Sequence, residues 1–104
     1  MEFGAALTPA GPIVWCWYAG DGGRTGLVPD SNVAIRRDGN QLIYEFLLPR
    51  SILRGVPLDP GSVLGFNYIA NDDDGQGYRG ATEWTPGMTG TKDASLFGDL
   101  VLEK

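Results

Sequence analysis

The sequence predicts an all-β fold, an antiparallel β-sandwich of the jelly-roll type, built as a single domain over residues 1–104. Sixteen glycines and seven prolines are spread along the chain and form no repeat, which is typical of many short elements joined by turns. Between the turn signals lie short apolar runs of strand length. Hydrophobic residues make up 42% of the chain, an ordinary fraction that allows one modest core.

The first strand that we expect is Pro12–Tyr18, an apolar and aromatic run between Gly11 and the glycine cluster at 20–23. Its length and its valine and aromatic content favour a strand over a helix. Because side chains alternate along a strand, one face carries Val14, Cys16 and Tyr18 and the other carries Ile13, Trp15 and Trp17.

A hairpin is predicted next, after a glycine-rich loop from residue 19 to about residue 30. Its strands are Ser31–Arg37 and Gln41–Leu48, and the Asp38–Asn40 segment between them has the Asp-Gly and Gly-Asn pairs that tolerate positive φ. On the second strand, Glu45 lies on the face opposite the alternating residues Leu42, Tyr44, Phe46 and Leu48.

The second half of the chain predicts one helical turn and three further strands. Pro49 ends the hairpin and starts a turn at Arg50–Leu53, and Val56–Pro60 is a connection. The strands are Val63–Asn71, Arg79–Trp84 and Phe97–Leu102, and Asn67 lies on the face opposite Leu64, Phe66, Tyr68 and Ala70. The total is about six strands and no substantial helix.

Charge and composition exclude several classes of function. The formal net charge is −5, so nucleic acids and anionic membranes are poor partners. The chain has no histidine and a single cysteine, Cys16, which excludes a Ser-His-Asp triad, a Cys-His pair, a histidine or paired-cysteine zinc site and an intrachain disulfide. We expect Cys16 to be buried and inert, with a reactive thiol as the alternative. Residues 1–10 have neither the basic start of a signal peptide nor the length of a membrane span.

From Val33 onward, a succession of short motifs resembles the C-terminal portion of family 9 carbohydrate-binding modules and their DOMON-like relatives. The motifs are Val33–Gly39, Tyr44–Pro49, Gly65–Asn67, Asn71–Gly75, Arg79-Gly80, Glu83-Trp84 and Phe97–Leu102. These families are β-sandwiches of secreted or envelope proteins, so the resemblance implies such a location. The family's opening strands have no counterpart before Val33, so either the fold is truncated or Met1–Asp30 substitutes for them.

The resemblance implies that the chain holds the terminal sugar of a glucan or xylan between two tryptophans. Apolar sugar faces pack on aromatic rings while polar side chains bond the hydroxyls. By motif position Trp84 is one wall, and the N-terminal segment offers Trp15 or Trp17 as the second wall. In the alternative interpretation, Trp15 and Trp17 fill the core, and Trp84 is as readily buried as exposed.

Glu45, Asn67, Arg79 and Glu83 form the polar part of the predicted carbohydrate site. Side chains of these types, placed on neighbouring strands, suit hydroxyl recognition. The alternative is a solvated outer face with an ion pair such as Glu45 with Arg79, which contributes little.

The Asp72–Gly77 loop is the densest run of charge in the chain. Adjacent carboxylates repel one another, and a hard cation relieves that repulsion, so Asp72 and Asp74 are candidate calcium ligands. The alternative is an ordinary acidic turn in which aspartate side chains cap backbone amides.

The prediction is therefore noncatalytic carbohydrate binding. A glycosidase needs two carboxylates across a cleft, and Glu45 with Glu83 or Asp72 supplies them only formally, without an evident lid or second lobe. The alternative is a truncated sandwich that acts as a homo-oligomeric assembly module, in which unpaired sheet edges pair with a second copy. Haem or metal binding is a weaker third interpretation, because only Met1 and Met88 offer thioethers.

Overall fold

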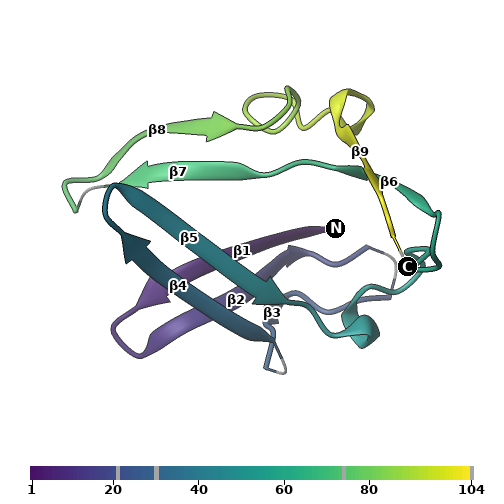
Figure 1. Ribbon diagram of the computed structural model, residues 1–104, viewed down its shortest axis with the longest axis horizontal. Coiled ribbons are helices and arrows are strands. Elements are labelled where there is room, and N and C mark those ends of the chain that lie inside the picture. Colours follow the sequence, from purple (N-terminus) through teal and green to yellow (C-terminus); the bar gives the residue numbers. More distant parts are fainter. Residues whose placement is uncertain (21, 30, 74, 104) are drawn as a thin grey trace. The chain divides into compact units, whose positions relative to one another are not determined.

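The computed structural model in Figure 1 is built almost entirely of antiparallel strands, which confirms the all-β class. It describes residues 1–20, 22–29, 31–73 and 75–103. The chain divides into two compact units, an N-terminal unit (Met1–Gly55) and a C-terminal unit (Val56–Lys104). Both the sandwich arrangement and the single domain stay predictions.

The first sheet of the N-terminal unit has the strand order β1-β2-β3. Its strands are β1 (Glu2–Thr8), β2 (Gly11–Tyr18) and the short β3 (Gly26–Leu27). The sequence predicted β2 but not β1 or β3.

The β1–β2 connection explains why β1 was missed. Pro9 and Pro12, which interrupt the apolar run, lie in and just after a two-residue hairpin loop, because Thr8 pairs directly with Gly11. The Thr8 hydroxyl accepts a hydrogen bond from the Ala10 N–H at 3.2 Å and donates to the Gly11 carbonyl at 2.7 Å. Gly11 has φ 111°, a conformation that favours glycine. The apparent break is therefore a turn between two paired strands.

The second sheet of the N-terminal unit is the predicted hairpin of β4 (Asn32–Asp38) and β5 (Gln41–Leu47). Asp38 pairs with Gln41, so Gly39 and Asn40 form the loop, and Gly39 has φ 57°. Positive φ at the first loop residue is the pattern of a type II′ turn, which matches the twist of the strands. Beyond β5, Pro49 precedes the 3-10 turn η1 (Arg50–Ile52), as predicted.

The core of the N-terminal unit lies between β2 and β4, which pack against each other. It consists of Val14, Cys16, Ala19 and Val28, and the partly buried side chains around it are Phe3, Val33, Leu48 and Ile52. The predicted burial of Cys16 is confirmed, and Val14, predicted to share its face, is buried beside it. Tyr18 is exposed instead, beyond a register shift opposite Glu2 and Phe3.

The C-terminal unit has two strand pairs (Figure 1). They are β6 (Val63–Phe66) with β9 (Gly98–Val101), and β7 (Ile69–Asp73) with β8 (Tyr78–Glu83); the 3-10 turn η2 (Ala94–Leu96) precedes β9. The Asp93 side chain caps η2 by accepting from the Ser95 N–H at 3.0 Å. Strands β8 and β9 confirm the last two predicted strands to within a residue or two.

The predicted strand Val63–Asn71 is wrong as a single element, because β6 and β7 are separate strands with different partners. The interruption lies at Asn67 and Tyr68. The Asn67 carboxamide forms hydrogen bonds with the backbone of the next residue, Tyr68, and of the distant residue Thr85. These bonds replace strand pairing at this point. None of the described helices has the length and apolar character needed to cross a membrane.

Candidate functional site

Trp84 stands at the end of the β7–β8 hairpin. Glu83 pairs with Ile69, and the Trp84 N–H donates to the Tyr68 carbonyl at 3.1 Å, which extends the strand pairing by one residue. Residues opposite each other in an antiparallel pair share a face. The rings of Tyr68 and Trp84 accordingly stack, with centroids 6.2 Å apart and planes 12° from parallel.

The indole of Trp84 also rests on the β6–β9 pair. The Phe66 ring lies 6.2 Å from it, tilted by 53°. A Cβ atom on Gly98 would come within 2.9 Å of the indole Cη2 and Cζ3 atoms. Only a glycine in β9 leaves room for the ring in this position. Trp84 is nonetheless 49% exposed and Tyr68 is 55% exposed, so the aromatic pair is held in place and uncovered.

Asn67 fixes the backbone that carries Trp84. Its Oδ1 accepts from the Tyr68 N–H at 2.9 Å and from the Thr85 N–H at 3.0 Å. Its Nδ2 donates to the carbonyls of Thr85 at 2.6 Å and Pro86 at 3.3 Å. A carboxamide has two donors and two acceptor lone pairs. All four are used within the chain, so in this structure the amide is occupied in positioning the Trp84 segment.

Glu83 is engaged with the loop that follows Trp84. One carboxylate oxygen accepts from the N–H groups of Met88 at 2.9 Å and Thr89 at 3.0 Å, and the other accepts from the Thr89 hydroxyl at 2.9 Å. These bonds lower the pKa of Glu83, the Thr89 N–H most, then the Met88 N–H and the Thr89 hydroxyl. Adjacent residues of a strand face opposite ways, so Glu83 lies on the face opposite Trp84.

Arg79 is the extra residue at a register shift. Asp72 pairs with Gly80 and Asp73 pairs with Tyr78, so the register shifts by one residue at Arg79. Such a bulge redirects the side chain. The guanidinium Nη2 donates to the Gln76 side-chain oxygen at 3.2 Å, which directs Arg79 towards the β7–β8 turn.

The structure assembles a polar and aromatic face around Trp84 that sequence reasoning missed in part. By register and alternation, Tyr68, Ala70 and Asp72 of the β7 side share this face with Gly80, Thr82 and Trp84 of the β8 side. All but Gly80 are exposed. Strand alternation predicts from the sequence that Thr82, two residues before Trp84, shares its face. Tyr68 was assigned to an apolar strand face and was not considered as a site residue.

In the acidic loop Asp72–Gly77, an aspartate side chain caps backbone amides, as in an ordinary acidic turn. The Asp73 carboxylate accepts from the N–H groups of Gly75 at 2.9 Å and Gly77 at 3.2 Å. Asp72 lies on the Trp84 face, and Asp74 lies outside the described residues. Among the residues that the structure describes, no three histidine, cysteine or carboxylate side chains are grouped for a metal. Calcium binding by Asp72 and Asp74 stays a prediction.

Trp15 and Trp17 belong to the N-terminal unit and do not fill its core. They are 39% and 62% exposed on the outer face of β2, with ring centroids 5.9 Å apart and planes tilted by 47°. The indole Nε1 of Trp17 lies 2.9 Å from where a Cβ on Gly4 would be, so this ring lies over β1. The core-filling interpretation is therefore wrong for both side chains, and their role as a second sugar wall stays a prediction.

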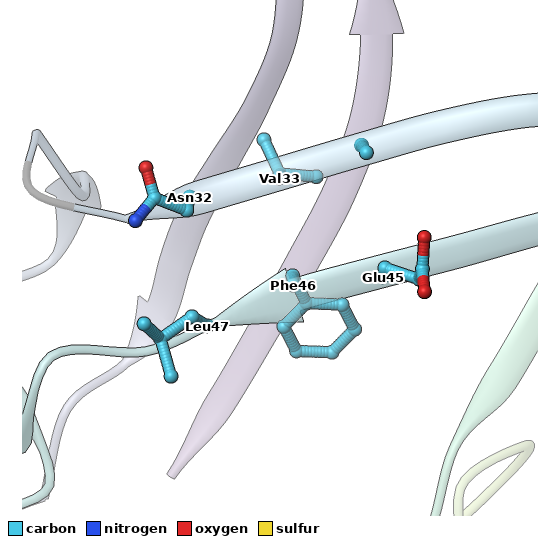
Figure 2. Close-up of a pocket in the computed structure, with 6 residues that line it drawn as sticks. Asn32, Val33, Glu45, Phe46 and Leu47 are labelled. Carbon is cyan, nitrogen blue, oxygen red and sulfur yellow. The ribbon is translucent and has the colours of Figure 1, made fainter.

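Glu45 is exposed on β5, opposite Ala34. It lines a shallow, open hollow on the hairpin of the N-terminal unit, shown in Figure 2. The residues that line the hollow are Asn32, Val33, Ala34, Glu45, Phe46 and Leu47. Glu45 is the single charged residue among these six, and the lining is otherwise largely apolar.

Comparison with family models, with curated proteins and with solved structures gives no match to this chain.

Proposed function

We propose that the protein binds a neutral glucan or xylan without catalysis, through the face of the C-terminal unit that carries Trp84. The resemblance to family 9 carbohydrate-binding modules suggests this class of ligand. The observation that carries the proposal is the state of Trp84: its ring is fixed by Tyr68, Phe66 and Gly98, yet about half of its surface is uncovered.

A fixed, exposed indole is suited to a sugar ring. The pyranose C–H groups are weakly positive and pack on the negative face of the aromatic system. Because Trp84 does not have to be ordered on binding, little side-chain entropy is lost. Tyr68 extends the aromatic surface beside it.

Polar groups along the same face complement the hydroxyls of a sugar chain. The hydroxyls of Tyr68 and Thr82 both donate and accept, and the Asp72 carboxylate accepts. Alternate residues of a strand are about 7 Å apart, so the face extends about 14 Å from Trp84 to Gly80. Ala70 and Gly80 are small and leave the backbone open between the polar groups.

The other predicted residues take different roles in this proposal. Asn67 and Glu83 are positioning residues that hold the segments before and after Trp84. Arg79 contacts sugar units beyond the β7–β8 turn. Glu45, Trp15 and Trp17 belong to the N-terminal unit, and their part in sugar binding stays a prediction. The Glu83 carboxylate is used to order the loop at Met88 and Thr89, so we assign it no catalytic step.

Affinity gel electrophoresis against soluble xylan, mixed β-glucan and cellooligosaccharides tests the proposal. We expect retardation on at least one of these ligands and its loss in Trp84→Ala. Tyr44→Ala is the matched control, because Tyr44 is an aromatic of similar exposure, 48%, in the N-terminal unit. The proposal fails if no ligand retards the wild-type protein, or if Tyr44→Ala and Trp84→Ala lose binding equally.

A further inference from the structure

Strand β1 forms one edge of the first sheet of the N-terminal unit, away from the Trp84 face of the proposed sugar site in the sequence. Among the described residues, β1 has backbone pairing with β2 alone, so its other edge is unpaired. Exposed edges in soluble proteins are usually protected by a lysine, a proline or a bulge in the strand. The segment from Phe3 to Leu7 has no charged residue and no proline.

We propose that β1 pairs antiparallel with β1 of a second copy of this chain, about a twofold axis at Ala5. A twofold axis brings the same strand of both copies together, so every contact occurs twice. Strand addition at an open edge is a common mode of recognition, in which backbone hydrogen bonds supply affinity and side-chain fit supplies specificity. The two three-stranded sheets then form one continuous sheet.

The side chains of β1 are self-complementary in this register. Phe3 lies opposite Leu7 of the second copy, on the same side of the sheet as Val14 and Cys16. Leu7 is 66% exposed in the single chain, and the aromatic ring of the second copy covers it. Aromatic and aliphatic pairs across strands stabilise a sheet. On the other face, Gly4 lies opposite Ala6, so no large side chain of β1 itself opposes pairing.

Charge also favours this register. Glu2 is the sole ionisable side chain of β1, and it lies opposite Thr8 of the second copy instead of opposite another carboxylate. The two Glu2 residues are then at opposite ends of the paired segment, about 20 Å apart. Each copy has a net charge of −5, and this long-range repulsion is screened by salt. The dimer is therefore expected to strengthen as ionic strength rises.

Sedimentation velocity from micromolar to millimolar protein tests the pairing. We expect a concentration-dependent dimer for the wild type. Ala6→Lys places two ammonium groups beside the twofold axis and should give a monomer throughout the range. Ala10→Lys is the matched control: it makes the same change of charge at an exposed residue in the β1–β2 loop, and it should dimerise like the wild type.

Cysteine crosslinking tests the register. Ala5→Cys puts two thiols directly opposite each other across the axis, and mild oxidation should give a covalent dimer. Leu7→Cys, opposite Phe3, should not crosslink, and neither should the wild type, whose Cys16 is buried. Circular dichroism checks that each variant folds, and if Ala5→Cys does not fold, the comparison of the two lysine variants still decides the case.

A wild-type protein that remains monomeric at millimolar concentration overturns the proposal, as does a dimer that Ala6→Lys leaves intact. A dimer that crosslinks through Leu7→Cys and not through Ala5→Cys overturns the register. Failure here is distinguishable from failure of the sugar site, because Trp84→Ala should dimerise normally and Ala6→Lys should still bind sugar.

Discussion

Asn67 holds the backbone of Thr85 through both of its peptide groups, accepting from the N–H at 3.0 Å and donating to the C=O at 2.6 Å. These bonds join residues 18 positions apart. They fix the residue directly after Trp84, and a third bond, from the Tyr68 N–H at 2.9 Å, fixes the residue whose ring stacks on Trp84. One carboxamide therefore positions both members of the exposed aromatic pair.

We expect Asn67→Ala to lower the free energy of unfolding by about 1–3 kcal/mol, because it leaves several backbone groups without partners. Urea denaturation measures this change. Sugar affinity should fall as well, since Trp84 and Tyr68 lose their common support. Asn71→Ala is the control, as Asn71 is an exposed asparagine of β7 on the opposite face from Tyr68, and it should change neither quantity.

Gly98→Ala should displace the Trp84 ring, because the added methyl would lie 2.9 Å from two indole carbons. We expect sugar affinity to fall about tenfold, equivalent to about 1.4 kcal/mol, as measured by titration of tryptophan fluorescence. Gly65→Ala provides the comparison: its methyl would meet only the Phe97 Cβ at 3.9 Å, an ordinary contact. Equal affinity in the two variants would show that the contact of Trp84 with Gly98 is not needed for binding.

Glu83 should make the protein sensitive to acid. Its pKa is lower in the folded chain than its ordinary value of 4.5, because the Thr89 and Met88 N–H groups and the Thr89 hydroxyl bond the carboxylate. Its contribution to stability is therefore present above about pH 4.5 and is lost as the pH falls through the folded pKa. Asp93 adds a contribution of the same sign, since the Ser95 hydroxyl and N–H lower its pKa.

Urea denaturation at a series of pH values measures the effect of Glu83. We expect Glu83→Gln to be less stable than the wild type at neutral pH and to lose less stability on acidification. Glu45→Gln makes the same change of charge at an exposed residue of β5 and should match the wild type at neutral pH. Parallel stability curves for the wild type and Glu83→Gln would contradict a special role for this carboxylate.

The paired replacement of Trp15 and Trp17 by alanine tests the second aromatic wall. If either indole contacts the sugar, losing one stacked ring should weaken binding by about tenfold, the upper part of the range for an aromatic pair. Isothermal titration calorimetry measures this loss, with the sugar that retards the wild-type protein in affinity gel electrophoresis as the ligand. Unchanged affinity would confine the site to the C-terminal unit.

The hairpin of β4 and β5 could be predicted from sequence because turn chemistry is local. Gly39 adopts the positive φ that the Asp-Gly-Asn segment favours. Alternation correctly placed Val14 and Cys16 on one face of their strand, and that face lies in the core. Strand β1 was missed because its central Gly4-Ala5-Ala6 gives little alternation and Pro9 was interpreted as a break. The proline instead begins the loop of a second hairpin.

The site was less predictable than the fold. The bonds from Asn67 to Thr85 and Pro86, which separate β6 from β7, leave no local pattern in the sequence. The direction of Glu83 follows from register, which requires the strand pairing to be known. The exposure of Trp15 and Trp17 depends on whether another element covers their face, and their own neighbours in sequence do not determine that.

Because Gly98 supports the Trp84 ring, the proposed sugar site is complete only after β9 has been synthesised. Trp84 is synthesised before Gly98, because it comes earlier in the chain. Until β9 pairs with β6, the indole has no support from the β9 backbone. A chain made only as far as η2 therefore contains every residue proposed to touch sugar, yet lacks the β9 backbone that supports the Trp84 ring on one side. Sugar binding would then report that the last strand has been completed and docked.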